Sequence, residues 1–192
     1  ERFGPMTLPE DAPVAELARL YLEKPEQAVA KHPYRAPPAA VAEPLPGGNG
    51  VLLPAAIFRD AYGPVFYSWW CKPGRNAAII YAPRSPRPSV MRASFTLEKA
   101  PAGGATLDME GQDSQNDLLP PAQIRITLNG AVVYEGDCGF VKKGWSRRDF
   151  PVAAGVLKAG ENALEVRNVY EGTARLDGWW FALSEAKITF GK

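Results

Sequence analysis

Aromatic, amide and charged side chains gather in three segments of the second half of the chain, 111–122, 136–145 and 169–178. Aromatic rings can stack on the C–H faces of sugars, while carboxylates, amides and arginines exchange planar hydrogen bonds with hydroxyl groups. This chemistry predicts a saccharide ligand. The candidate contact residues, in or next to these segments, are Gln112, Asp113, Asn116, Trp145, Arg147, Tyr170 and Trp179. The alternative is that the tryptophans cap the end of a core and the charged residues are simply solvated.

Residues suited to catalysis are few. The only histidine, His32, lies far from the polar segments, and the sequence contains no Gly-x-Ser-x-Gly, phosphate-binding glycine loop or clustered metal ligands. A glycosidase needs only two carboxylates, and Asp113 with Glu171 or Asp177 is the pair to test. A lyase could instead use Tyr170 and an arginine. Because no motif supports either reaction, the sequence predicts a protein without catalytic residues.

Alternation of apolar and polar residues predicts several half-buried strands. It is clearest in "SVMRASFTLEK" (89–99) and recurs in "ATLDME", "QIRITL" and "ALEVRN". Asn129-Gly130 between two such runs predicts a hairpin over Gln123 to Glu135. Short strands without helix-length crossovers predict an all-β fold, an antiparallel jelly-roll β-sandwich.

The three polar segments should lie at one end of this sandwich. Successive antiparallel strands reverse direction, so 111–122, 136–145 and 169–178 alternate with turns at the opposite end. Binding sites on such scaffolds are commonly built from loops that cluster at one end. We therefore expect the ligand there.

The first 46 residues differ from the rest. Apolar residues at helical spacing predict a short helix, and "YRAPPAAVAEPLPGGNG" resembles an extended connector. The expected division is an N-terminal helical and Pro-rich appendage, 1–46, and a sandwich, 47–192. The chain begins without methionine or a signal-peptide pattern, which suggests a processed product and favours a secreted, periplasmic or cell-surface location.

Overall composition excludes some partners. The net charge is +1 over 192 residues, which gives no electrostatic reason to expect nucleic acid. No apolar run approaches the roughly 18 residues that suggest a membrane span. The two cysteines, Cys71 and Cys138, permit a disulfide without establishing it.

Three segments carry a resemblance to a known fold: "IRITLNGAVVYEGD", "GWSRRDFPVAAGVLKAGENALEVRNV" and "WWFALSEAKITF". Together they resemble the galactose-binding-like jelly roll, which occurs in carbohydrate-binding modules and in sugar-binding domains attached to glycoside hydrolases. The resemblance covers roughly 105–190 and implies a carbohydrate ligand and an attached catalytic domain as partners.

Members of this fold often hold a structural Ca²⁺, with a carboxylate of the last strand among its ligands. By resemblance Glu185 matches that position, and Asp60, Glu110 and Asp113 are alternative companions. Ca²⁺ needs about six to eight oxygen ligands. The other interpretation is that Glu185 is exposed and paired with a Lys or Arg.

The closing strand, "GWWFALSEAKITF", contains two adjacent tryptophans that must point to opposite faces. One face contains only apolar or small residues and is predicted to be the core face: Trp180, Ala182, Ser184, Ala186, Ile188 and Phe190. The opposite face begins with Trp179, Phe181 and Leu183, which are too apolar to be left bare, and a β-bulge could change the parity.

Three functions fit the sequence. The main hypothesis is a non-catalytic carbohydrate-binding module that recognises a polysaccharide or oligosaccharide through loops at one end. The alternatives are a structural or interaction module of a larger polysaccharide-active protein, and a small polysaccharide hydrolase or lyase.

Overall fold

The computed structural model describes residues 40–65, 77–114, 119–171 and 180–191. They belong to one compact unit, Ala39–Lys192, and the other unit is Glu1–Pro38. The expected N-terminal helix lies outside the described residues. So do several residues singled out in the sequence: His32, Cys71, Asn116, Asp177 and Trp179.

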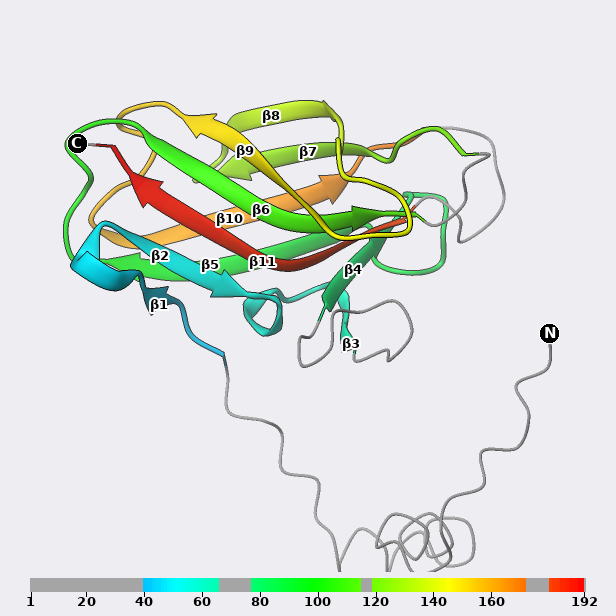
Figure 1. Cartoon of the computed structure of the whole chain (residues 1–192), viewed down its shortest axis with the longest axis horizontal. Helices are drawn as coiled ribbons and strands as arrows, with labels where there is room; N and C mark the ends of the chain where they lie inside the picture. Colours follow the sequence, from blue (N-terminus) through cyan, green and yellow to red (C-terminus); the bar gives the residue numbers. More distant parts are fainter. Residues whose placement is uncertain (1–39, 66–76, 115–118, 172–179, 192) are drawn as a thin grey trace, which may run out of the picture. The chain divides into compact units, whose positions relative to one another are not determined.

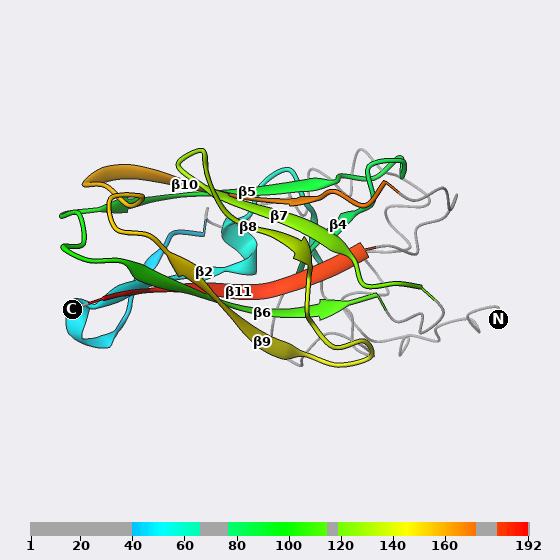
Figure 2. The same ribbon diagram turned by 90° about the horizontal axis from the view of Figure 1, so that it is seen from above.

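Two antiparallel sheets make up the described part (Figures 1 and 2). The large sheet has seven strands: β1 (Glu43–Pro44), β2 (Gly50–Pro54), β3 (Tyr62–Val65), β4 (Ala77–Tyr81), β6 (Ala105–Asp113), β9 (Ser146–Val152) and β11 (Trp180–Phe190). The small sheet has the order β5-β10-β7-β8: β5 (Val90–Leu97), β10 (Gly160–Asn168), β7 (Gln123–Leu128) and β8 (Ala131–Asp137). Two short 3₁₀ turns, η1 (Pro46–Gly48) and η2 (Ala55–Ile57), flank β2.

The prediction of an all-β antiparallel sandwich is confirmed. Figure 2 shows β5, β10 and β7 in one layer and β11, β6 and β9 in the other. The expected domain boundary near Gly47 falls between β1 and β2, which pair with each other. Within the described residues, no helix is long and apolar enough to cross a membrane.

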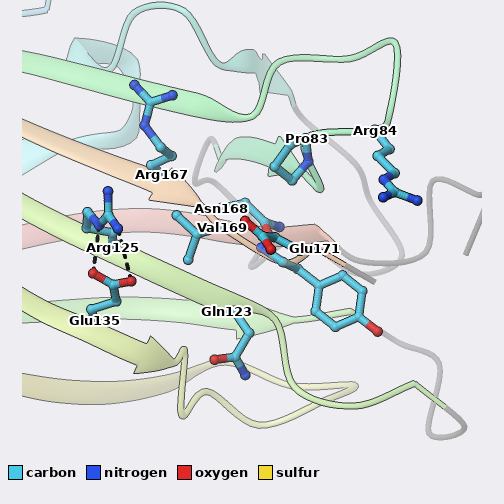
Figure 3. Close-up of a pocket in the computed structure, with 10 residues that line it drawn as sticks. Pro83, Arg84, Gln123, Arg125, Glu135, Arg167, Asn168, Val169 and Glu171 are labelled. Carbon is cyan, nitrogen blue, oxygen red and sulfur yellow. Dashed lines mark hydrogen bonds and ion pairs between the residues drawn. The ribbon is translucent and has the colours of Figure 1, made fainter. Parts of the chain in front are cut away.

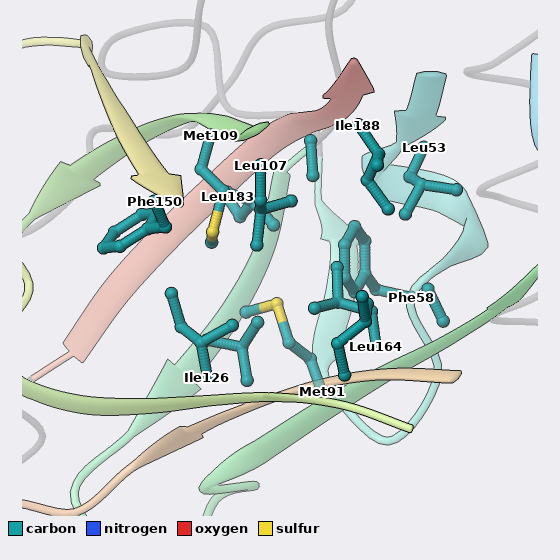
Figure 4. Packing of buried hydrophobic residues seen from close by; sticks show 14 of the residues in the cluster. Leu53, Phe58, Met91, Leu107, Met109, Ile126, Phe150, Leu164, Leu183 and Ile188 are labelled. Atoms are coloured by element: carbon teal, nitrogen blue, oxygen red, sulfur yellow. The ribbon is translucent and has the colours of Figure 1, made fainter. Parts of the chain in front are cut away.

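The core lies between the sheets and is built from alternate residues of each strand (Figure 4). On β5 the buried set is Met91, Ala93, Phe95 and Leu97, and the polar residues between them are exposed, as alternation predicts. Across from them the large sheet contributes the buried side chains Leu53, Leu107, Met109, Phe150, Leu183 and Ile188. Burial of these apolar surfaces is the main source of stability.

The Asn129-Gly130 hairpin forms as predicted between β7 and β8. Both residues have positive φ, 52° and 84°, the conformation that a tight hairpin turn requires. The Asn129 side chain also donates to Val156 O at 2.7 Å and to Asn162 Oδ1 at 2.8 Å. This turn is therefore tied to the loop between β9 and β10, in which Leu157 is buried.

The central strand of the large sheet, β11, contains a β-bulge. Its register with β6 shifts between Leu183 and Glu185, so that Ser184 is the extra residue. Before the bulge Phe181 and Leu183 face the core, and after it Ala186 and Ile188 do. The prediction that Trp180 faces this core is therefore wrong.

Trp180 instead lies on the outer face of the large sheet. It packs with Trp145 against a second, smaller cluster of buried residues, Ala77, Ile79, Tyr81 and Ala182. The physical reason for the error is the extra residue, because it reverses the alternation of the strand's first half relative to its second.

The described parts of the polar segments converge at one end of the sandwich, the right-hand end in Figure 1. There the Asp113 N–H donates to Val141 O, the Cys138 N–H to Ala122 O and the Val169 N–H to Gln123 O. We call this the loop end; its described segments outside the strands are 82–89, 119–122, 138–145 and 169–171.

Truncating single side chains of β11 tests which of its residues face the core. Phe181→Ala should lower the free energy of unfolding by about 3–5 kcal/mol, because Phe181 is fully buried. Trp180→Ala should cost less, since Trp180 is only half-buried. Urea denaturation measures both, with the exposed Thr189→Ala as a control within about 0.5 kcal/mol of the parent. A larger loss from Trp180→Ala than from Phe181→Ala would mean that the parity is the reverse.

Candidate functional site

The structure distributes the predicted site residues over three places. Four lie on the outer face of the large sheet: Gln112, Trp145, Arg147 and Glu185. Asp113 points into the sandwich, and Tyr170 lines a pocket beside the small sheet. Asn116 and Trp179 are outside the described residues.

Arg147 is the centre of an ion-pair network on the outer face. Its Nη1 lies 2.9 Å from Glu185 Oε1 and 3.8 Å from Glu110 Oε1, and its Nε donates to Asp108 at 3.1 Å. Hydrogen bonding to Asp108 is the main reason that the pKa of Arg147 is raised. Lys187 Nζ lies 3.0 Å from Glu185 Oε1. Arg147 therefore holds strands β6, β9 and β11 together.

Three of the carboxylates suggested for a Ca²⁺ site, Glu185, Glu110 and Asp60, are already engaged. Glu185 is neutralised by Arg147 and Lys187, Glu110 accepts from Ser184 Oγ at 2.6 Å, and Asp60 pairs with Arg92 at 2.7 Å. The described residues contain no group of three or more His, Cys, Asp or Glu that could hold a metal ion. The surroundings of Glu185 fit an ion-pair network and do not fit Ca²⁺. Calcium binding elsewhere in the chain stays a prediction.

Trp145 and Gln112 border the outer cluster of Ala77, Ile79, Tyr81 and Ala182. Gln112 is opposite Ala182 in the register and almost fully buried, yet its Oε1 has no hydrogen-bond donor among the described residues. Trp145 is half-buried against the cluster. Trp145 could contact a ligand over the face of the large sheet or complete the cluster as a structural residue, whereas Gln112 is too enclosed for direct contact.

Asp113 is a buried acid that organises the loop end. Its Oδ1 accepts the N–H of Ser114 at 2.7 Å and of Ala122 at 3.3 Å, while Oδ2 has no partner among the described residues. Burial raises the pKa of Asp113; the two backbone N–H groups, Lys142 and Cys138 partly offset the effect. A side chain so enclosed cannot contact a polysaccharide directly, and we assign Asp113 a structural role.

Cys138 is a free thiol buried next to Asp113, and because Cys71 lies outside the described residues, the disulfide that the sequence left open stays untested. Burial is the main cause that raises the pKa of the Cys138 thiol to about 12, and the charge of Asp113 adds to it. Cys138 is therefore a packing residue.

Glycine at position 111 allows the core to close at the loop end. A Cβ there would lie 2.8 Å from the Phe140 ring. Phe140 in turn stacks on Phe181, with ring centroids 6.3 Å apart. The loop that contains Phe140 can thus lie directly on β6.

An open pocket of about 790 Å³ lies at the loop end, on the outer side of the small sheet (Figure 3). Its residues come from β7, β8 and β10 and from the segments after β4 and β10: Pro83, Arg84, Gln123, Arg125, Glu135, Arg167, Asn168, Val169, Tyr170 and Glu171. Tyr170 is the only aromatic residue among them. The pocket thus combines one ring with amide, carboxylate and guanidinium groups.

Of these residues, Tyr170 was a contact candidate and Glu171 half of a possible acid–base pair with Asp113. The structure leaves Asp113 buried and Glu171 exposed in the pocket, so this pair is not formed. Arg84, Arg125 and Arg167 were missed. In sequence, Arg125 and Arg167 on alternating strands and Arg84 in the loop after β4 look like ordinary solvated residues, and only the sheet order reveals that Arg125 and Arg167 are opposite each other.

Comparison with known proteins identifies the fold. The sequence matches no protein-family model and no curated protein. A family 35 carbohydrate-binding module from an environmental isolate matches with a TM-score of 0.50 and 11% identity, over 72% of this chain and 91% of the module. The described part is therefore a β-sandwich like those of carbohydrate-binding modules, as the galactose-binding-like resemblance predicts.

Two larger proteins contain a similar sandwich. A ruminal GH26 endo-β-1,4-mannanase matches with a TM-score of 0.50 and 14% identity, over 73% of this chain and 26% of the mannanase. The insecticidal delta-endotoxin Cry8Ea1 of Bacillus thuringiensis matches with a TM-score of 0.55 and 9% identity, over 77% of this chain and 25% of the toxin. This chain thus spans about a quarter of each. At such identities the likeness concerns the fold alone.

The burial of Asp113 predicts a pH-dependent stability. Its pKa in the folded state is raised above the ordinary 3.8, so the folded protein binds this proton more tightly than the unfolded chain. The free energy of unfolding therefore falls as the pH rises from the pKa that Asp113 has in the unfolded chain to its higher pKa in the folded protein. Asp113→Asn should become more stable relative to the parent over that interval, because an amide keeps the oxygen that accepts both backbone N–H groups.

Urea denaturation at a series of pH values measures this difference, with Asp149→Asn, at an exposed position of the neighbouring strand β9, as the control. Parallel stability curves for Asp113→Asn and the parent would contradict the assigned burial.

The Cys138 thiol should not react in the folded protein. In a Cys71→Ser variant, which leaves one thiol, a disulfide reagent such as dithionitrobenzoate should modify Cys138 only after denaturation, because the thiol is buried and its pKa is about 12. The absorbance of the thiolate released from the reagent follows the reaction. The Cys138→Ser variant, which retains Cys71, gives the reactivity of the Cys71 thiol for comparison. Rapid modification of native Cys138 would exclude this burial.

Proposed function

We propose that the protein is a non-catalytic carbohydrate-binding module that recognises a polysaccharide or oligosaccharide at the loop end of its sandwich. The observation that carries the proposal is the open pocket of about 790 Å³, which brings Tyr170 together with the polar groups of Arg84, Gln123 and Glu171. The likeness to a family 35 carbohydrate-binding module supports it at the level of the fold.

The chemistry of the pocket suits a sugar. The Tyr170 ring offers an apolar surface for C–H groups, and its hydroxyl can exchange a hydrogen bond. The Gln123 amide and the Glu171 carboxylate offer planar donors and acceptors for ring hydroxyls. Because the pocket is open to solvent, a sugar unit can enter while remaining linked to its neighbours in a chain.

The outer face of the large sheet is a second candidate location for the same function. Trp145 provides a half-buried ring there, whereas Gln112 is almost fully buried and is too enclosed to contact a polysaccharide directly. Asn116 and Trp179, outside the described residues, remain contact candidates. Tyr170 follows β10 of the small sheet and Trp145 precedes β9 of the large sheet, so substituting each separately tells which surface is used.

Tyr170→Ala should weaken binding to a soluble polysaccharide about tenfold, because loss of a stacking ring removes on the order of 1.4 kcal/mol. Affinity electrophoresis over a panel of neutral and acidic polysaccharides, followed by calorimetry on the best ligand, measures the effect. Val132→Ala truncates an exposed apolar side chain at the opposite end and should bind like the parent.

Three outcomes contradict parts of this proposal. Absence of binding to the whole panel would rule out the function. Binding that survives Tyr170→Ala but is lost in Trp145→Ala would move the site to the large sheet. Release of shortened products from any polysaccharide would favour the hydrolase or lyase alternative.

A structural or interaction module of a larger polysaccharide-active protein is the second proposal. It is favoured by the mannanase, in which the matching sandwich is about a quarter of the chain. This proposal requires no saccharide affinity, so the same panel separates the two. Both proposals include an extracellular or periplasmic location, because polysaccharide substrates lie outside the cytoplasm.

A further inference from the structure

Two arginines face each other on the small sheet. Arg125 of β7 and Arg167 of β10 are register partners, and both line the pocket at the loop end. Like charges directly opposite each other on neighbouring strands destabilise a sheet. The two arginines therefore need negative charges nearby, and the surrounding carboxylates contact Arg125 more favourably than Arg167.

Arg125 is well compensated. Glu135 of β8 accepts from its Nε at 2.7 Å and from its Nη2 at 3.0 Å, so the carboxylate binds the guanidinium with both oxygens. Hydrogen bonding to Arg125 lowers the pKa of Glu135, which keeps it charged. Figure 3 shows this pair joined across the two strands.

Arg167 is less well compensated. Its Nε and Nη2 donate to a single oxygen, Oε1 of Glu165, at 3.2 and 3.0 Å. The other oxygen of Glu165 accepts from Arg92 Nε at 2.8 Å. One carboxylate thus serves two guanidinium groups, although Arg92 also contacts Asp60.

Arg84 adds a third guanidinium group to the pocket. Within the described part of the chain, no hydrogen bond or ion pair involves its side chain. Figure 3 shows Arg84 at one end of the pocket and Arg125 and Arg167 at the other. The lining therefore holds three guanidinium groups, of Arg84, Arg125 and Arg167, against two carboxylates, of Glu135 and Glu171.

Guanidinium groups bind planar and tetrahedral anions in paired hydrogen bonds more favourably than they bind neutral hydroxyls. We infer that the pocket selects acidic saccharides, whose carboxylate or sulfate groups bind Arg167 at one end and Arg84 at the other. Glu171, exposed between them, opposes the same ligand by repulsion. This inference rests on the proposed function, and it identifies the class of saccharide that the pocket binds.

Matched polysaccharides test the charge requirement. Polygalacturonate is compared with its methyl ester, and dextran sulfate with dextran, so each pair differs only in the anionic group. Calorimetry should show at least tenfold tighter binding of the acidic member in one pair. The pair that responds distinguishes a carboxylate from a sulfate ligand. Affinity should also fall between about 0.01 M and about 1 M salt, as the Debye length shortens from about 30 Å to about 3 Å.

Variants assign the effect to the pocket. Arg84→Gln and Arg167→Gln should each weaken binding of the acidic polymer about tenfold, the loss of one charge-assisted contact. Glu171→Gln should strengthen it about threefold by removing a repulsive charge. Arg59→Gln, an exposed arginine that does not line this pocket, is the matched control and should leave affinity unchanged. Urea denaturation checks that Arg167→Gln is folded.

The possible outcomes distinguish the selectivity for acidic saccharides from the proposed saccharide-binding function. Equal affinity for acidic and neutral members, or an equal loss in Arg59→Gln and Arg84→Gln, would overturn acidic selectivity while leaving saccharide binding intact. No binding to any of the four polymers or to the wider panel would overturn both.

Discussion

The β-bulge of β11 is the constraint on which the large sheet depends. This strand pairs with β6 along one side, and along the other with β4 and then β2. In a regular strand, alternate residues share one face along the whole length. Without the extra residue, the large apolar residues of the first half of β11 would lie on the opposite face from those of its second half. By inserting Ser184 opposite Glu110, the chain places Phe181 and Leu183 on the same face as Ala186 and Ile188.

The bulge also explains why several chemically attractive residues have structural roles. Ser184 Oγ donates to Glu110 Oε2 at 2.6 Å, and Glu110 and Glu185 both lie near Arg147. Two carboxylates side by side in neighbouring strands would repel each other, and Arg147 compensates for this. Arg147 and Glu185 are therefore explained by the fold, whereas the guanidinium groups that line the small-sheet pocket are not.

The sequence alone predicts those structural features that are determined by residues close together in the chain. Alternation identifies β5, and Asn129-Gly130 identifies the β7–β8 hairpin. A β-bulge in β11 is an alternative that the sequence leaves open, but its position escapes prediction because a serine at a bulge looks like a serine in a regular strand. The inward direction of Asp113 escapes for the same kind of reason, since a carboxylate at a strand end is ordinarily solvated. Arg125 and Arg167 are 42 positions apart, and their meeting follows only from the sheet order.

The opposed arginines are the feature least explained by stability. An exposed Arg–Glu pair such as Arg125–Glu135 contributes little to stability, so compensation of this kind barely offsets a repulsion that a neutral residue at position 167 would avoid. Nor does packing require Arg167, whose side chain is 40% exposed. Three guanidinium groups beside an open pocket, with Arg167 sharing the carboxylate of Glu165 and Arg84 at the far end, are therefore more consistent with recognition of an anion than with maintenance of the sheet.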